Sequence, residues 1–422
     1  MGVIIYMRDY SKEQRHLAIE QTKNMPVGIN NTSIQIFNII RNSNGISRAE
    51  LARVIGMSKS TISQHVNVLI DLGFIVESDE TQFSGGRKAQ LLKLHKTSGY
   101  VLAIDLGATS LNISICNLNA EPLIIESEDT NVADGPEIVL NRIVDVSRNL
   151  LNKLDLSSSL LKGVGIGLPG PVEFSSGIPV APPIMPGWDQ YPVRGFLEKE
   201  FGCPAYVDND VNIMTLGEQW AGIGKDVQNF IFIKVGTGIG SGIVCQGNLY
   251  RGSMGCAGDI GHIGIDGLET VCSCGNKGCL ESLAGGKAIS MRAIEQVRKN
   301  KSQVLADLLA KQGSLSAKEV GLAASMGDAA SVEIIKESGK FIGQVLAKLI
   351  NFFNPSLVVI GGGVANLGDL FLASIRGAVY NRSLPLATRN LSIERSVLNE
   401  QAGIIGAAAM VLDKLFLEHM CS

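Results

Sequence analysis

The sequence predicts an α/β protein made of a small N-terminal head, with helices and a β-hairpin, and a larger two-lobed body. Two patterns lead to this prediction. Two closely spaced helices followed by a hairpin occupy residues 47–94, and beyond residue 99 three buried strands each run into a glycine-rich turn. Composition agrees, because 48 glycines and an aromatic content of 5% suit an α/β protein with many tight turns better than an all-β one.

The size and hydropathy of the chain limit the class of protein. Its 422 residues are long enough for two or three domains, and a hydrophobic content of 45% is that of a globular protein. No stretch approaches the roughly 20 apolar residues that span a bilayer. The first ten residues contain Arg8 and Asp9 and have no small-residue cleavage site, unlike a secretory signal. We therefore expect a cytoplasmic protein without a membrane partner.

The head has the pattern of a winged helix-turn-helix. Ser47 and Glu50 form a capping box for a helix at 48–55, Gly56 breaks that helix, and Ser58 caps a second helix at 59–72. An earlier helix at 32–40 completes the small core. Short polar side chains near the start of a second helix are the type that reads the major groove. In this helix they are Lys59, Ser60, Ser63, Gln64 and Asn67.

A basic hairpin tip and the charge balance point the same way. Strands at 74–76 and 91–94 flank a flexible tip in which Arg87 and Lys88 are placed to reach phosphates or a minor groove. Residues 1–100 carry 12 Lys and Arg against 8 Asp and Glu, whereas the rest carries 25 against 32. Double-stranded operator DNA is the predicted partner, and a helical domain that binds protein is the alternative.

Three glycine-rich turns follow buried strands in the body. The strands at 100–104, 230–235 and 357–360 lead into Asp105-to-Thr109, Gly236-to-Gly242 and Gly361-to-Gly363. The first two turns can grip phosphates with backbone and hydroxyl groups, and the third lets the backbone approach an adenine or ribose closely. Each turn by itself also fits an ordinary tight hairpin. If ATP binds, the phosphate-binding residues are Asp105, Gly107, Thr109, Gly236, Thr237 and Gly238.

A polar run lies between the first two turns, after the glycine-rich segment Gly165–Gly170. Asp210 lies between a short apolar strand and a helix at 211–221, where a carboxylate can act as general base on a sugar hydroxyl, with Asn209 beside it. An Asx turn that caps the helix is the alternative for Asp208 or Asn209, but it does not explain the whole run.

Three cysteines and a histidine have the spacing of a metal site. Cys272, Cys274 and Cys279 lie within eight positions, and His262 lies ten residues upstream. Together they can close a tetrahedral zinc site, in which four protein ligands leave no open position, so the zinc is structural. Coincidence or redox chemistry are the alternatives, and the lack of a Cys-x-x-Cys pair argues against the second.

These motifs, in this order, resemble the ROK family of repressors and sugar kinases over residues 30–422. The resemblance rests on Asp105-to-Thr109, Gly165-to-Gly170, Asn209-Asp210 and Gly236-to-Gly242. It implies an actin/hexokinase-like, ribonuclease H-like fold with two lobes around a sugar and ATP cleft. The head places the chain in the regulator branch of the family.

The resemblance also implies ligand residues. The family's zinc ligands correspond to His262, Cys272, Cys274 and Cys279. Its sugar-binding residues correspond to Asn209, Asp210, Asp259, His262 and Glu281. Position 259 is Asp where the sugar kinases carry Glu, which sets one carboxylate about a methylene further back and leaves the identity of the sugar open.

The expected organisation is an N-terminal helical extension at 1–30, a DNA-binding head at 31–96 and a body at 97–422 with the zinc loop at 257–281. The predicted function is repression of carbohydrate genes, with a monosaccharide or sugar phosphate altering operator affinity in a homodimer or homotetramer. The alternative is a sugar kinase that also binds DNA, with Asp210 as catalytic base and ATP with magnesium as cofactor. A zinc hydrolase is excluded because the metal has no open position.

Overall fold

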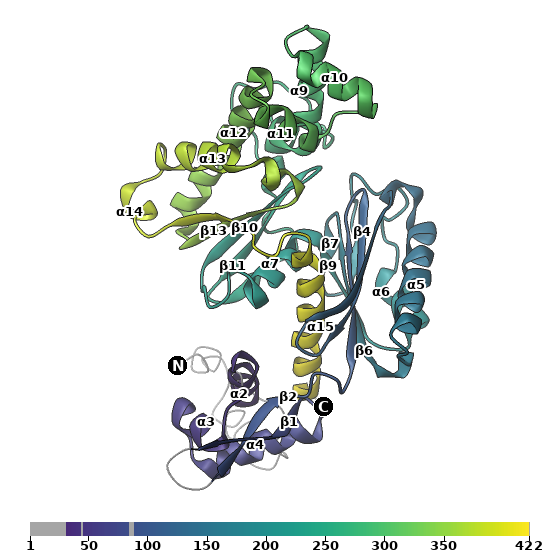
Figure 1. Ribbon diagram of the computed structural model, residues 1–422, viewed down its shortest axis with the longest axis vertical. Coiled ribbons are helices and arrows are strands. Elements are labelled where there is room, and N and C mark those ends of the chain that lie inside the picture. Colours follow the sequence, from purple (N-terminus) through teal and green to yellow (C-terminus); the bar gives the residue numbers. More distant parts are fainter. Residues whose placement is uncertain (1–30, 44, 84–87, 422) are drawn as a thin grey trace, which may run out of the picture. The chain divides into compact units, whose positions relative to one another are not determined.

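The computed structural model describes residues 31–43, 45–83 and 88–421 (Figure 1). The predicted extension at 1–30 and the wing residue Arg87 lie outside the described residues. The chain divides into two compact units, one of Met1–Ser98 with Leu412–Ser422 and the other of Gly99–Val411. The division falls within helix α15 (Gln401–Cys421), so the end of this helix groups with the head.

Three helices build the head: α2 (Asn31–Asn42), α3 (Arg48–Ile55) and α4 (Lys59–Asp71). The Ser47 hydroxyl accepts a hydrogen bond from the Glu50 N–H at 3.2 Å, and the Ser58 hydroxyl accepts one from the Thr61 N–H at 3.1 Å. Gly56, with a φ of 74°, ends α3 in the left-handed conformation that glycine adopts without strain. The predicted helix-turn-helix is therefore confirmed.

The wing is an antiparallel pair, β1 (Ile75–Phe83) and β2 (Lys88–Leu94), whose register shifts between Ser78 and Thr81. Both strands are longer than the sequence predicted. The prediction missed the added residues because most of them are polar and they lack the alternation that marks a half-buried strand. Ile46 pairs with Leu92 through two backbone hydrogen bonds and ties the wing to the helices. The core beneath consists of fully buried side chains, including Ile36, Leu51, Ile62, Val66, Leu69 and Leu92.

The body contains two five-stranded sheets of identical topology. In each, a three-stranded antiparallel meander continues into two parallel strands. The first has the order β5 (Pro122–Asp129), β4 (Ser110–Asn117), β3 (Tyr100–Leu106), β6 (Leu161–Leu168) and β9 (Ala205–Asn209). The second has the order β12 (Asn248–Tyr250), β11 (Ile239–Cys245), β10 (Phe230–Val235), β13 (Leu357–Gly361) and β14 (Ser392–Arg395). This duplication confirms the two-lobed α/β body.

Helices cover the sheets (Figure 1), and the described residues bury one hydrophobic cluster against the first sheet and two against the second. The first lobe uses α5 (Pro136–Lys153) and α6 (Val193–Phe201), with η1 (Val132–Asp134), η2 (Ser158–Leu160) and the small pair β7 (Val172–Glu173) and β8 (Ile178–Pro179). The second uses α8 (Leu280–Ala284), α9 (Gly286–Arg298), α10 (Gln303–Gln312), α11 (Ala317–Ser325), α12 (Ala329–Phe353), α13 (Asp369–Tyr380) and α14 (Pro385–Thr388), with η3 (Ile260–His262) and η4 (Gly363–Leu367).

Glycines let α7 (Asp210–Ala221) and α15 pack directly against β6. A Cβ atom at Gly165 would lie 2.2 Å from the Ala407 carbonyl oxygen, and one at Gly167 would lie 2.2 Å from the Ile213 side chain. Gly406 approaches the Ile213 carbonyl in the same way. Gly165 and Gly167 therefore serve close packing, because no larger residue fits between these elements.

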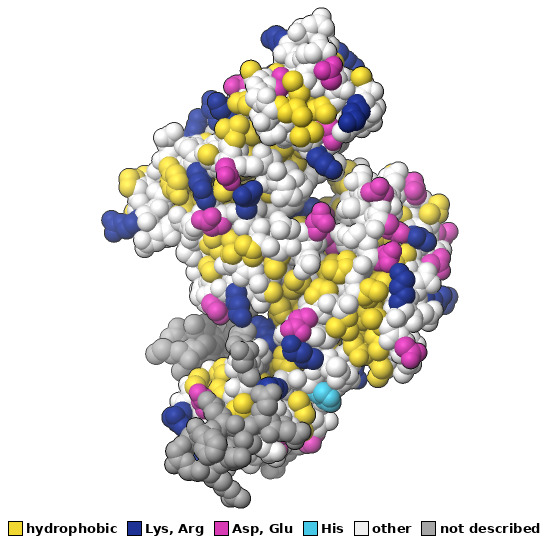
Figure 2. Space-filling model, in the orientation of Figure 1, with side chains coloured by type: hydrophobic (Ala, Val, Ile, Leu, Met, Phe, Trp, Pro, Cys, Tyr) yellow, Lys and Arg dark blue, Asp and Glu magenta, His cyan; other side chains and the backbone are white. Residues whose placement is uncertain are grey.

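The described surface gives two further facts. Lys, Arg, Asp and Glu side chains are interspersed over the face of the body seen in Figure 2. The excess of acidic residues in the body therefore forms no single negatively charged patch among the described residues on this face. None of the described helices combines the length and hydropathy that crossing a bilayer requires.

Candidate functional site

The first glycine turn places Asp105 beside a helix N-terminus. Asp105 pairs across the hairpin with Asn112, whose side chain hydrogen-bonds to it. A Cβ atom at Gly403, in the first turn of α15, would lie 2.2 Å from Asp105 Oδ2. Glycine at this position thus allows the carboxylate to approach the positive end of the helix dipole.

The second turn, between β10 and β11, holds Glu281. The Ile239 N–H donates a hydrogen bond to Glu281 Oε2 at 3.2 Å, and a Cβ atom at Gly238 would lie 2.2 Å from the same oxygen. The Gly286 N–H donates to the Gly236 carbonyl at 2.7 Å. The turn predicted to bind phosphate is therefore attached to the helix that carries a predicted sugar ligand.

A cavity of about 640 Å³ lies between the two sheets of the body. Of the predicted phosphate-binding residues, Asp105 and Gly107 line it, whereas Thr109, Gly236, Thr237 and Gly238 are not among the lining residues. The third turn, Gly361–Gly363, does line it. Sequence reasoning missed Lys234, Arg395 and Glu400 in the lining, and a lysine inside the apolar strand Phe230–Val235 was the available signal.

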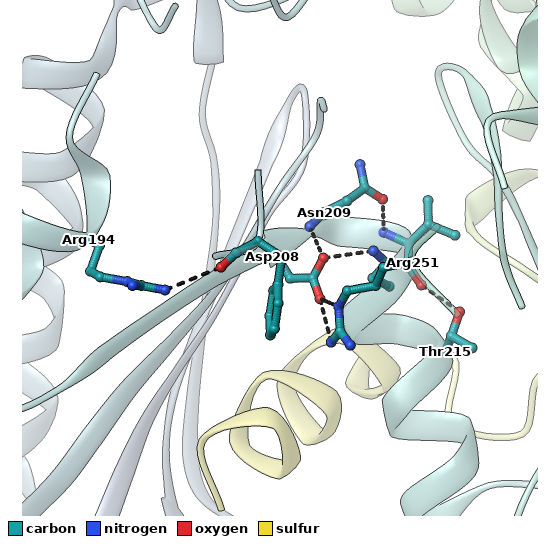
Figure 3. A network of polar contacts seen from close by, with 8 residues as sticks. Arg194, Asp208, Asn209, Thr215 and Arg251 are labelled. Atoms are coloured by element: carbon teal, nitrogen blue, oxygen red, sulfur yellow. Dashed lines mark hydrogen bonds and ion pairs between the residues drawn. The ribbon is translucent and has the colours of Figure 1, made fainter. Parts of the chain in front are cut away.

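A buried ion pair joins the end of β9 to the loop that leads to the metal residues (Figure 3). Asp208 Oδ1 accepts from the Asn209 N–H at 2.8 Å and from Asn212 Nδ2 at 2.7 Å, and Oδ2 pairs with Arg251 at 2.8 Å. The Arg251 guanidinium lies 3.8 Å above the Phe174 ring. Asp208 and Arg251, which sequence reasoning did not select, thus hold two distant segments together.

Asn209 has a structural use as well as a predicted sugar-binding one. Its side-chain oxygen caps α7 by accepting from the Val211 N–H at 2.9 Å. Its amide nitrogen donates to the Gly170 carbonyl at 2.9 Å. The Asx-type cap considered as an alternative is therefore present, and it fixes the position of the side chain.

Asp210, the predicted base, is buried at the first position of α7 and forms an ion pair with Lys234. The turn that carries Asp259 and His262 is held by β11. There Ser241 donates hydrogen bonds to the Gly258 carbonyl from its N–H and from its hydroxyl, each at 2.8 Å. The β10–β11 hairpin therefore contacts the segments that carry four of the five predicted sugar residues, namely Asp210, Asp259, His262 and Glu281.

The four predicted metal ligands converge. The ligand atoms of His262, Cys272, Cys274 and Cys279 all lie within 4.8 Å of one another. Cys272 Sγ is 3.6 Å from His262 Nδ1, and Cys274 Sγ is 3.7 Å from Cys279 Sγ. A tetrahedral zinc places two thiolate sulfurs about 3.8 Å apart and a sulfur and an imidazole nitrogen about 3.5 Å apart. The donor set and its spacing therefore fit a metal ion such as zinc.

The metal loop folds back as a small hairpin. Val271 pairs with Lys277, and Gly264 pairs with Cys279. Gly278 has a φ of 70°, and a Cβ atom there would lie 2.7 Å from the Leu268 carbonyl oxygen, so the return of the loop requires glycine. Cys279 is the N-cap residue of α8, which carries Glu281 two positions later. The cluster therefore lies directly beside a predicted sugar ligand.

The predicted recognition face of α4 is largely exposed. Lys59, Ser60, Gln64 and Asn67 are exposed and Ser63 is half-buried. Asn67 Oδ1 accepts from Arg48 at 2.9 Å, and Arg48 also pairs with Glu77 of the wing at 2.7 Å. Asn67 is thus engaged within the head. Lys88 is the first residue of β2.

Comparisons with known proteins match both parts of the chain. A profile of the ROK family matches residues 101–414, and a winged helix-turn-helix DNA-binding profile matches residues 29–76. The xylose repressor of Caldicellulosiruptor bescii is 32% identical over 370 residues, covering 88% of this chain and 92% of the relative. The glucokinase of Halalkalibacterium halodurans is 35% identical over 314 residues, covering 74% and 94%.

A solved structure agrees over almost the whole length. It is the crystal structure of a ROK family transcriptional regulator, a homologue of the E. coli Mlc protein. It aligns with a TM-score of 0.79 and 28% identity over 92% of this chain and 98% of that chain. The family profile covers more than half of the sequence, and a relative above 30% identity aligns over most of its length. The chain therefore belongs to the ROK family.

Proposed function

We propose that this protein is a sugar-responsive transcription regulator that binds operator DNA through residues 31–96 and a sugar through residues 97–422. The observation that carries the proposal is the presence, in one chain, of a winged head and a ROK body. The alignment with the glucokinase covers 94% of that enzyme but only 74% of this chain, whereas the regulator of known structure aligns over 92% of it. A DNA-binding head has little use on a dedicated metabolic kinase.

The effector in this proposal is a monosaccharide or sugar phosphate held by Asn209, Asp210, Asp259, His262 and Glu281. The names of the relatives, xylose repressor and glucokinase, support a monosaccharide, and the first supports repression. Helix α15 begins beside the cavity, and its residues from Leu412 belong to the unit that contains the head. A ligand that prefers one arrangement of the lobes can thereby alter DNA affinity.

The metal in this proposal is one structural zinc ion. Four protein ligands leave no position for a substrate, so its role is to hold the loop that carries Glu281. His262 faces the cluster through Nδ1. Its other ring nitrogen is then available to a sugar hydroxyl, and metal binding at Nδ1 fixes the orientation of the ring.

The working assembly in this proposal is a homodimer or homotetramer in the cytoplasm. Helix-turn-helix proteins bind two half-sites through twofold symmetry, which one head alone does not supply. A regulator of this kind acts in the compartment that holds its operator DNA, and we propose that this compartment is the cytoplasm. ATP and magnesium enter only under the kinase alternative.

Substitution of Asp210 distinguishes a sugar sensor from a sugar kinase. In a sensor, Asp210→Asn removes a charged acceptor worth about 1.5–3 kcal/mol, so sugar affinity falls by roughly ten- to a hundredfold. The response of DNA binding to sugar then shifts to higher sugar concentration but remains. In a kinase the same change removes the general base and lowers turnover by roughly a hundredfold or more. The measurement is ATP consumption beside sugar-dependent release of a DNA fragment selected by the wild-type protein.

The matched control is Asp145→Asn, the same change at an exposed position of α5, which leaves both readouts unchanged. We expect no turnover in the wild type. Wild-type turnover of about 1–1,000 per second, lost in Asp210→Asn, contradicts the sensor and establishes the kinase.

A further inference from the structure

Lys234 is a charged residue within an otherwise apolar strand of the second sheet. Its partners across the sheet are Gly240 on β11 and Gly361 on β13. Directly paired residues share one face of a sheet, so on its own face Lys234 has no side chain beside it on either neighbouring strand. The two glycines thus leave room for the lysine stem to extend into the cavity, where Lys234 is one of the lining residues.

The ammonium group meets carboxylates from two different elements. Lys234 Nζ forms an ion pair with Asp210 Oδ2, with side-chain exposures of 22% for the lysine and 6% for the aspartate. Asp105, on β3 of the other sheet, lines the same cavity as Lys234. The three charges interact electrostatically, because Lys234 lowers the pKa of Asp105 and Asp210 raises it. Lys234 therefore contacts the Asp210 carboxylate directly and interacts electrostatically with the carboxylate of Asp105.

The charge states follow from this arrangement. Burial acts to lower the pKa of Lys234, but the Asp210 and Asp105 carboxylates outweigh it and raise that pKa above its usual value. Burial raises the pKa of Asp105 to about 6, while Lys234 acts in the opposite direction. Lys234 is therefore a cation at neutral pH, and a protonated lysine has no lone pair with which to act as a base.

We infer that Lys234 is a built-in counter-ion to Asp105 and Asp210, so that the cleft binds its ligand without a divalent cation. Buried carboxylates without an ammonium partner either take up a proton or bind another cation, and carboxylate oxygens are the ligands that Mg²⁺ and Mn²⁺ prefer. With Lys234 present, Asp210 is held as a hydrogen-bond acceptor for a sugar hydroxyl. Lys234 is thus a positioning residue. The inference rests on the proposed sensing function and adds that the ligand is a sugar bound without metal.

The experiment uses Mn²⁺ alone as the probe, with full-length protein whose zinc site is loaded. In the wild-type protein, Asp105 and Asp210 bind no Mn²⁺. Lys234→Met keeps an apolar stem and removes the charge, so it binds one Mn²⁺ at least about tenfold more tightly than wild type. Lys234→Met with Asp105→Asn loses that ion. Electron paramagnetic resonance of free Mn²⁺ measures the uptake.

Two controls separate charge from structure. Lys234→Arg keeps the positive charge and behaves like the wild type, which a purely steric role for the lysine does not predict. Lys287→Met makes the same change at an exposed position of α9 and gains no Mn²⁺. If Lys234→Met does not fold, Lys234→Gln replaces it with the same expected gain.

Two results overturn the inference. One is wild-type binding of Mn²⁺ that Asp105→Asn abolishes. The other is a folded, neutral variant at position 234 that takes up no more Mn²⁺ than the wild type. Because the probe needs neither sugar nor DNA, either result leaves the proposed function standing. Conversely, a lack of sugar-dependent DNA release contradicts the proposed function and leaves the Mn²⁺ result unchanged.

Discussion

Cys274→Ser is expected to remove the bound zinc and with it the response to sugar. Wild-type protein carries about one zinc per chain, and the variant, with three ligands and one exchange-labile position, carries well under half of that under chelation. Cys274 is the exposed member of the cluster, so serine replaces it without leaving a cavity in a core. Elemental analysis measures the metal, and thermal shift with a panel of monosaccharides and their phosphates measures the response.

The loss of the sugar response follows from the connection between the cluster and the cleft. Cys279 is the N-cap residue of α8, and Glu281 of α8 accepts a hydrogen bond from the Ile239 N–H at the start of β11. Cys256→Ser is the matched control, because Cys256 is also exposed and lies outside the cluster. It should leave metal and response unchanged. A folded wild-type protein without stoichiometric metal, or a metal-free variant with a normal sugar response, contradicts the proposed zinc role.

Local patterns predicted the parts of this molecule that depend on local physics. The caps at Ser47 and Ser58 mark α3 and α4, because a side-chain oxygen satisfies an otherwise unpaired N–H wherever the chain starts a helix. The strand Phe230–Val235 has the bounds that its run of apolar residues predicts. The metal cluster also follows from spacing, since three thiolates within eight positions lie within reach of one ion.

Residues brought together from distant segments were the part that the sequence could not predict. Lys234 lies 24 positions from Asp210, and no periodicity indicates that they pair. Arg395, the last residue of β14, and Glu400, which follows that strand, line a cavity that Asp105 of the other sheet also lines. The need for glycine at position 403 is visible only once the Asp105 carboxylate is known to lie beside it. Each of these contacts depends on the packing of the two sheets, which a pattern along one segment does not contain.

Two glycines of the family motif Gly165–Gly170 have a packing role. Gly165 and Gly167 provide space for α15 and α7. Thr109, which the sequence predicted to bind phosphate, is not among the residues that line the cavity. It is exposed and its carbonyl accepts from the Thr130 N–H, while its neighbour Ser110 lines the cavity. Composition alone does not separate close packing from ligand approach, since both require small residues.

Gln64→Glu is expected to lower affinity for the selected operator by on the order of a hundredfold, because it replaces an amide that can pair with adenine by a carboxylate that DNA repels. Gln64 is exposed on α4, one turn beyond Ser60. It is a sharper target than Asn67, whose side-chain oxygen already accepts from Arg48. Fluorescence anisotropy with the selected fragment and a scrambled one, at one salt concentration, measures the loss of affinity and of sequence preference.

The matched control is Gln35→Glu, the same change of charge at an exposed position of α2. Long-range repulsion affects both variants alike and weakens with salt, whereas a lost base contact affects Gln64→Glu alone and persists. The difference between the two variants therefore isolates readout from net charge. Equal losses in both variants, or full affinity in Gln64→Glu, would show that α4 does not read the operator. In that case the alternative for the head, a helical domain that binds protein, becomes the better interpretation.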